Sequence, residues 1–256
     1  MNKVNFMNFL ARYKHISRRT KILTILSILL LVIGWQGYQK YQEKRLTAYR
    51  NYLEAGRGDF DAKDYDKAIF DFTGAINNSP RSEIALVYAL RAYSYYFKDD
   101  FDKVLADTDM VLKYSKDTPP ELFNLRGDAY RYSKRYDEAT TEYGKAYDLS
   151  SGDRDTVHNY AGGLLATKQW DRAYEVISKY FKDTPKEDYW EDTDVWYDRA
   201  FAALEVHRCM EASTSAWHLL MRTTDEGQKT VGEGVMHNAL NDKECIDKDT
   251  FAKDAK

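Results

Sequence analysis

The sequence of 256 residues is poor in the residues that break regular structure, with only 4 prolines and 13 glycines. Because proline and glycine mark turns and loops, their scarcity argues against a loop-rich or all-β chain and favours helices. Two cysteines are too few for a disulfide scaffold or a four-cysteine zinc site. His207, His218 and His237 have no zinc-ligand spacing with these cysteines. We therefore expect no metal site and no cofactor.

Sequence motifs of common enzyme classes are also missing. The chain has no phosphate-binding G-x-x-x-x-G-K-[ST], no G-x-G-x-x-G opening a helix, no G-x-S-x-G and no H-E-x-x-H. Acidic pairs such as Asp99–Asp100 and Glu187–Asp188 fall at expected turns, where carboxylates are solvated, and two carboxylates without a cleft do not make a glycosidase. The sequence predicts a protein that is not an enzyme.

Acidic residues are absent from residues 1–42, which hold seven lysines and arginines. Residues 43–256 contain the remaining 31 basic residues and all 41 acidic ones, a net charge of −10. An acidic body disfavours nucleic acid as a partner, because phosphate contacts need clustered lysine and arginine.

One long apolar run follows the basic head. No charged residue lies between Lys21 and Lys40, and a helix of that length rises roughly 27 Å, enough to cross the hydrocarbon core of a bilayer. Trp35, Tyr38 and Tyr41 occupy the positions of an interfacial aromatic belt. We interpret the run as an uncleaved transmembrane helix, residues 22–39. The alternatives are a cleaved signal peptide, for which no cleavage site follows the run, and a buried core helix.

The charges around this helix give its expected orientation. The short, acid-free head, residues 1–21, favours an N-terminus in the cytoplasm, although five basic residues precede the helix closely and four follow it. The chain is then a single-pass protein of the inner (cell) membrane, with its body in the periplasm or another extracytoplasmic space.

A short motif recurs along the body: a polar residue, an aromatic residue, aspartate, a variable residue and a small residue. The last residues of its four copies lie 36, 35 and 34 positions apart, at Ala68, Val104, Ala139 and Ala173. A period near 34 with a helical composition is typical of a helix–turn–helix repeat.

These residues resemble the tetratricopeptide repeat (TPR), which has a bulky residue at position 4, small residues at 8 and 20, aromatic residues at 11 and 24, alanine at 27 and proline at 32. The third repeat shows the pattern most fully, with Phe123, Gly127, Tyr130, Ala139, Tyr143 and Ala146. The repeats start at Tyr49, Ala85, Pro120, Arg154 and, in degenerate form, Thr193. The resemblance implies an all-α, right-handed α-solenoid of about five helix hairpins, in which small residues let the helices approach closely.

The expected organisation follows from the membrane run and the repeats. A basic cytoplasmic head at 1–21 precedes the transmembrane helix at 22–39 and a helical linker at 40–48. The TPR solenoid covers 49–222, and residues 223–256 form a C-terminal capping tail.

In the TPR family the first helix of each repeat lines a concave groove that binds proteins. The resemblance places a mixed aromatic and polar surface there, suited to a peptide or helix of a partner, and the alternative is a merely solvated face. The groove residues are Arg57, Tyr93, Tyr96, Asn124, Asp128, Arg131, His158, Tyr197 and Phe201. The family's carboxylate clamp, built from lysine and asparagine, is absent, because Leu53, Arg57, Ala89 and Tyr93 stand in its place. A chaperone co-adaptor is therefore disfavoured.

Cys209 and Cys245 lie 36 residues apart. Outside the cytoplasm two lone cysteines usually pair, and a disulfide here would hold the tail on the last repeat and stabilise the fold by roughly 3–4 kcal/mol. Free thiols and pairing with another chain are the alternatives.

The architecture resembles that of bacterial envelope TPR scaffold proteins. It implies a membrane-anchored scaffold that binds a protein partner or client in its groove. The alternative is a fixed structural subunit of a large envelope machine for secretion, motility or division.

Overall fold

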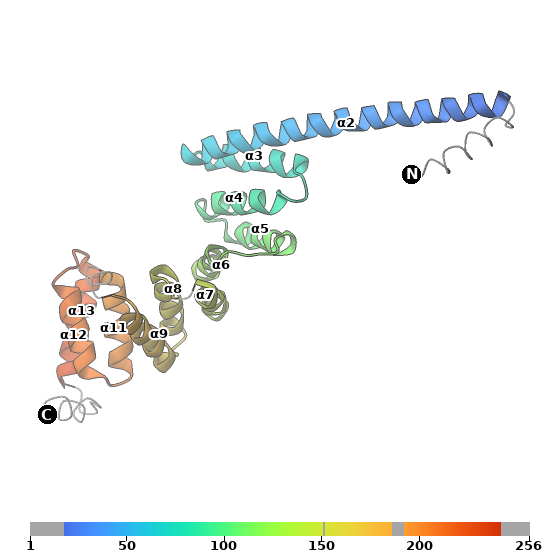
Figure 1. Ribbon diagram of the computed structural model, residues 1–256. Coiled ribbons are helices and arrows are strands. Elements are labelled where there is room, and N and C mark those ends of the chain that lie inside the picture. Colours follow the sequence, from blue (N-terminus) through green and yellow to red (C-terminus); the bar gives the residue numbers. More distant parts are fainter. Residues whose placement is uncertain (1–17, 151, 186–191, 242–256) are drawn as a thin grey trace, which may run out of the picture. The chain divides into compact units, whose positions relative to one another are not determined.

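The computed structural model describes residues 18–150, 152–185 and 192–241, and every regular element in these ranges is an α-helix. The chain divides into two compact units, residues 1–83 and 84–256, which are described separately. In both units, consecutive helices pair as antiparallel hairpins, and the described residues hold five of them (Figure 1). The expected all-α architecture of helix hairpins is confirmed.

The first unit is built by α2 (Arg18–Asp61) and α3 (Tyr65–Asn78). The single helix α2 contains the expected membrane segment, the linker and the first helix of the first repeat, and its C-terminal part packs on α3 (Figure 1). Tyr49 is buried in this contact and its hydroxyl donates to Oε2 of Glu83 at 2.7 Å. Burial and this carboxylate raise the pKa of Tyr49 to about 12, so the phenol stays protonated. Its hydrogen bond to Glu83 connects the C-terminal end of the first unit to α2.

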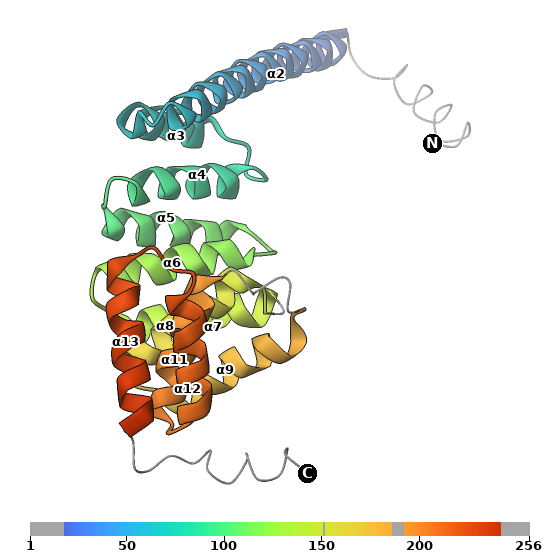
Figure 2. The same cartoon turned by 90° about the vertical axis from the view of Figure 1, so that its left-hand side faces the viewer.

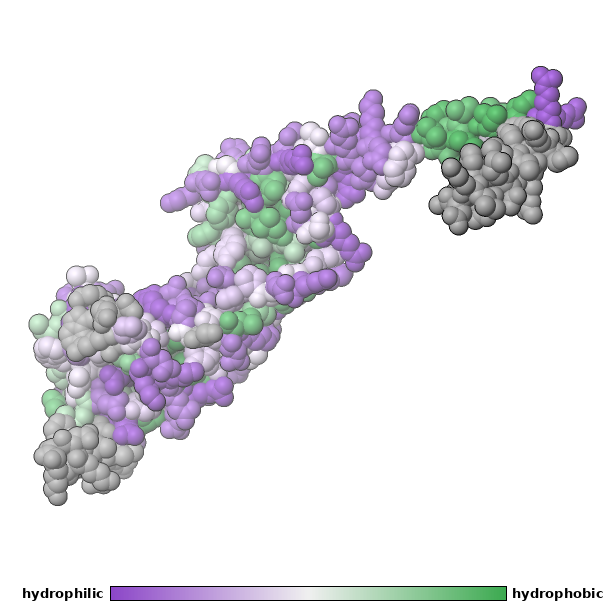
Figure 3. Space-filling model, in the orientation of Figure 1, coloured by the Kyte–Doolittle hydropathy of each residue, from purple (hydrophilic) through white to green (hydrophobic). Residues whose placement is uncertain are grey.

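The N-terminal part of α2 presents its apolar side chains to the outside. Every large apolar residue from Ile22 to Ile33 is 45–73% exposed, and Figure 3 shows this stretch as a continuous hydrophobic surface. By length and composition, α2 is the one helix of the described chain able to cross a membrane, and no described residue covers its apolar window.

The described residues of the second unit form four hairpins and one further helix. Each hairpin packs on the next, and the last helix packs on α11 and α12 (Figure 2). The helices are α4 (Ile84–Tyr96), α5 (Phe101–Tyr114), α6 (Pro120–Tyr132), α7 (Tyr136–Ser150), α8 (Arg154–Ala166), α9 (Trp170–Asp183), α11 (Thr193–Glu205), α12 (Cys209–Leu220) and α13 (Glu226–Asn241).

Small residues let the two helices of a hairpin approach, as the repeat pattern implies. A Cβ atom on Gly127 would lie 2.4 Å from Cε1 of Tyr143, a distance that carbon atoms do not reach without a shift. The alanines at the matching repeat positions are at most 2% exposed: Ala68, Ala92, Ala139, Ala161, Ala173 and Ala212. Close packing therefore explains why the pattern requires small residues at positions 8 and 20.

The turn inside each hairpin passes through a non-glycine residue in the left-handed region, with φ between 56° and 61°. The next residue donates its N–H to the carbonyl five positions earlier at 2.7–3.0 Å, which satisfies the end of the first helix. The left-handed residues are Lys63, Asp99, Lys134, Lys168 and His207. Each lies directly before a repeat motif or, for His207, before the N-terminus of α12. Asp99 falls at a turn expected from the sequence, but the sequence did not reveal the other four, because lysine and histidine are not turn signals.

This geometry predicts that Lys134→Gly stabilises the fold. A left-handed conformation costs a non-glycine residue about 1–2 kcal/mol, and glycine avoids this cost but loses about 0.5–1 kcal/mol in backbone entropy. We expect a net gain of about 0.5–1 kcal/mol in urea denaturation of the full chain in detergent, and a loss for Lys134→Val. Lys179→Gly, inside α9, is the control and should cost about 1 kcal/mol. If Lys134→Gly and Lys179→Gly destabilise the fold equally, Lys134 does not have the left-handed conformation.

Candidate partner-binding pocket

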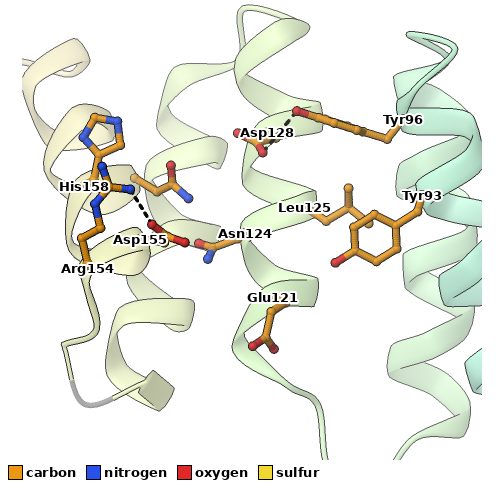
Figure 4. A pocket seen from close by; sticks show the side chains of 10 residues that line it. Tyr93, Tyr96, Glu121, Asn124, Leu125, Asp128, Arg154, Asp155 and His158 are labelled. Atoms are coloured by element: carbon orange, nitrogen blue, oxygen red, sulfur yellow. Dashed lines mark hydrogen bonds and ion pairs between the residues drawn. The ribbon is translucent and has the colours of Figure 1, made fainter. Parts of the chain in front are cut away.

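A pocket of about 370 Å³ lies between α4, α6 and α8, which are the first helices of three consecutive hairpins (Figure 4). Each helix presents one face to the pocket, because the hairpins stack with their first helices next to one another. The lining side chains are Tyr93, Tyr96, Glu121, Asn124, Leu125, Asp128, Arg154, Asp155, His158 and Asn159.

Five of the nine groove residues expected from the sequence line this pocket: Tyr93, Tyr96, Asn124, Asp128 and His158. Arg131, Tyr197 and Phe201 lie outside it. Phe201 packs against Trp170, with ring centroids 6.0 Å apart. Arg57 is an exposed residue of the first unit. A role of these nine residues in partner binding stays a prediction.

Five further residues line the pocket and were not expected from the sequence: Glu121, Leu125, Arg154, Asp155 and Asn159. Glu121 and Asp155 stand at the second position of their repeats, which the TPR family uses for the groove, so a signal was present. The other three stand at the first or sixth position, which the family pattern does not assign to the groove.

Asp128 is held in place at the centre of α6. Its Oδ1 atom accepts from the hydroxyl of Tyr143 at 2.7 Å and from Arg131 at 3.1 Å. Its Oδ2 atom faces the hydroxyl of Tyr96 at 3.5 Å (Figure 4). Burial and the charge of Asp128 raise the pKa of Tyr143, so this phenol remains a donor at neutral pH. One carboxylate oxygen is thus fixed by the core while the other faces the pocket.

Arg154 connects the pocket to the start of α11. Its guanidinium donates to Asp192 through Nε and to Asp194 at 3.0 Å, and Asp192 also accepts from the backbone N–H of Val195 as the N-cap of α11. Burial would raise the pKa of Asp192, but the hydrogen bonds from Arg154 and the helix end hold it below its usual range. A third carboxylate, Asp155, accepts from Arg154 at 2.7 Å. Each nitrogen of the guanidinium is therefore paired with an acid of its own chain.

His158 lies 2.7 Å from a buried carboxylate, measured from Nδ1 to Oδ2 of Asp198. Asp198 is 3% exposed, and its hydrogen bond raises the pKa of His158. The folded chain therefore binds a proton at this pair more tightly than the unfolded chain does.

This pair predicts that stability falls as the pH rises. The contribution of His158 is fully present below its unfolded pKa of about 6.5, and it is lost as the pH rises through the higher folded pKa. We expect the urea midpoint of the full chain to decrease above pH 6.5, and the decrease to flatten in His158→Gln. His237→Gln changes an exposed histidine and should keep the wild-type slope. An unchanged slope in His158→Gln would show that the pair does not bind the proton.

The predicted Cys209–Cys245 disulfide joins a described residue to one outside the described ranges. Cys209 is buried at the first position of α12, whereas Cys245 lies outside the described residues, as does the head up to residue 17. The disulfide therefore stays a prediction.

No protein-family model matches the sequence, and no curated protein sequence matches it. Solved structures match the fold. YrrB, a TPR protein with an unusual peptide-binding site, superposes with a TM-score of 0.62 at 13% identity, covering 77% of this chain and 97% of its own.

Two further structures show the same likeness. PilW, a widely conserved type IV pilus biogenesis factor, has a TM-score of 0.58 at 14% identity and covers 81% of this chain and 93% of its own. MamA has a TM-score of 0.58 at 14% identity, covering 68% of this chain and 91% of its own. With the repeat motifs and the hairpins described above, these likenesses show that the chain has the TPR fold.

Proposed function

We propose that this chain is a membrane-anchored TPR scaffold that binds a protein partner in the pocket between α4, α6 and α8. The observation that carries the proposal is the pocket itself, which three successive first helices build from aromatic and polar side chains. Such a surface suits the side chains of a peptide or helix. YrrB supports this use of the fold, because a peptide-binding site is described for it.

The exposed apolar part of α2 supports the anchor. A row of ten aliphatic side chains from Ile22 to Ile33 that nothing in the described chain covers is costly in water and stable in hydrocarbon. We propose that this segment crosses the inner membrane with the basic head in the cytoplasm and the solenoid on the other side.

A fixed structural subunit of an envelope machine is the second candidate. The continuity of α2 favours it, because one helix of 44 residues runs without a break from the apolar segment into the first hairpin. Such a helix would hold the first hairpin at a set distance from the bilayer, as a structural spoke requires.

Blocking the pocket tests the proposal. Affinity-tagged full chain is purified in detergent from its native membranes, as wild type and as Glu121→Lys/Asn124→Arg, which places two bulky cations at the pocket. The control, Thr141→Arg/Asp148→Lys, makes the same charge change at exposed positions of α7 outside the pocket.

We expect a partner that co-purifies with wild type and control and is depleted from the pocket variant. One stoichiometric complex would favour the machine subunit, whereas a changing set of proteins would favour client binding. Equal recovery with all three chains would show that this pocket is not the binding site.

A further inference from the structure

The charges of the pocket are unbalanced. Glu121, Asp128 and Asp155 line it, and three further carboxylates form ion pairs with its lining residues from behind, namely Asp192, Asp194 and Asp198. These six acids face three basic groups, Arg131, Arg154 and His158. The net charge is therefore −3 with one proton on the His158–Asp198 pair and −4 without it. The acidic character of the pocket does not depend on that proton.

The cations of this set are already occupied. Arg154 donates to three carboxylates and Arg131 donates to Asp128 and to the Tyr143 hydroxyl. His158 is bound to Asp198. An anionic group of a partner would meet no uncommitted cation among these residues, and it would be repelled by the excess of carboxylates.

The pocket also contains a hydrogen-bond acceptor that has no donor among the described residues. Asn124 lines the pocket, and its Oδ1 atom is closed to solvent and accepts no hydrogen bond within the described chain. A buried acceptor without a donor costs free energy, so a donor brought by a ligand would relieve it. This observation is independent of the charges, and it also points to a ligand that donates hydrogen bonds.

Aromatic rings complete the surface. Tyr93 and Tyr96 form the wall on α4, with Leu125 opposite Tyr93 (Figure 4). Burial and the carboxylates of Glu121 and Asp128 raise the pKa of Tyr93. Neutral phenol rings offer a face to the methylene stem of a long side chain and to a cation above the ring.

We propose that this pocket binds a lysine or arginine side chain of the protein partner, with Glu121, Asp155 and the Oδ2 atom of Asp128 as its counter-charges. The inference rests on the proposed function and names the chemistry of the group recognised. The group recognised is therefore positively charged, whereas a carboxylate clamp binds a negatively charged group of the partner.

Selected peptides test this chemistry. Random dodecapeptides displayed on phage are selected on the immobilised full chain in detergent and counter-selected on the Glu121→Lys/Asn124→Arg variant. Synthetic copies of the selected peptides are then compared with copies in which citrulline replaces arginine or norleucine replaces lysine. Affinities are measured by fluorescence anisotropy at low and high salt.

We expect the selected peptides to share a basic residue at one position, and the neutral replacement to weaken binding at least roughly tenfold, as for a lost charge-assisted hydrogen bond. Glu121→Gln/Asp155→Asn should weaken the basic peptide similarly and leave the neutral copy unaffected. Asp148→Asn/Glu175→Gln, the matched control on exposed positions of α7 and α9, should change neither. High salt should weaken only the basic peptide.

Two results would overturn the inference, and they differ in what they say about the proposed function. Peptides that depend on the pocket but bind equally well with citrulline or norleucine would keep the binding function and refute the recognition of a cation. A selection that yields no peptide dependent on the pocket would refute both.

Discussion

Replacing Tyr143 by alanine should lower the free energy of unfolding of the second unit by about 3–5 kcal/mol, the range for removing a large buried aromatic ring. Tyr143 is 1% exposed, its ring fills the space above Gly127, and its hydroxyl donates to Asp128. Tyr143→Phe keeps the ring and loses a hydrogen bond to a charged group, so it should cost only about 1.5–3 kcal/mol. Urea denaturation of the full chain in detergent, followed by circular dichroism, measures both.

The contact between Gly127 and Tyr143 can be tested in a double-mutant cycle. The effect of Gly127→Ala on the free energy of unfolding should change sign when Tyr143 is replaced by alanine. Gly127→Ala alone should destabilise, because its Cβ atom would overlap a ring that the hydroxyl network holds in place. In the Tyr143→Ala background the space is open, and the substitution should stabilise by about 0.5–1 kcal/mol through helix propensity.

Gly162→Ala is the control for this cycle. No atom lies within 4 Å of a Cβ at this position of α8, so alanine should stabilise both backgrounds alike. If Gly127→Ala has the same effect with and without the Tyr143 ring, the close contact does not exist.

Two arginines in the apolar part of α2 should release the chain from membranes. An arginine at the centre of a spanning helix costs about 2.5–3.5 kcal/mol on insertion scales, so Leu30→Arg/Leu31→Arg should shift the partition by several kcal/mol. We expect wild type to stay in the membrane pellet after alkaline carbonate extraction and the double variant to leave it.

Gln36→Arg/Gln39→Arg adds the same two charges near the end of the segment. There the long side chains reach the headgroups, so this control should remain in the pellet. Extraction of the wild-type chain by carbonate, or retention of the Leu30→Arg/Leu31→Arg chain, would contradict a membrane-spanning α2.

The hairpins could be predicted from the sequence because the information is local. A small residue such as Ala139 and an aromatic residue such as Tyr143 recur at fixed spacing within one hairpin, and the contact they form lies inside that hairpin. Ion pairs inside the hairpins recur as well, but the acidic partner of each arginine could not be identified from the sequence. Arg91 donates to Asp107, and Arg126 to Glu142, each across 16 residues, and several other acids of the same helices were equally available in the sequence.

The pocket was predictable in part for the same reason. Tyr93, Asn124 and His158 follow from repeat positions that the family assigns to the groove. Arg154 does not, because its conformation depends on Asp192, which lies 38 residues later as the cap of α11. The excess of carboxylates around the pocket could not be predicted either, because it includes residues such as Asp192 that lie far away in the sequence.

Crosslinking in native membranes shows directly whether a protein occupies the pocket between α4, α6 and α8. A photoreactive phenylalanine analogue replaces Tyr93, in the pocket, or Tyr136, which is 44% exposed outside it. We expect an adduct with a defined protein from position 93, its loss in the Glu121→Lys/Asn124→Arg chain, and little or none from position 136. Equal adducts from both positions, or none from position 93, would contradict it.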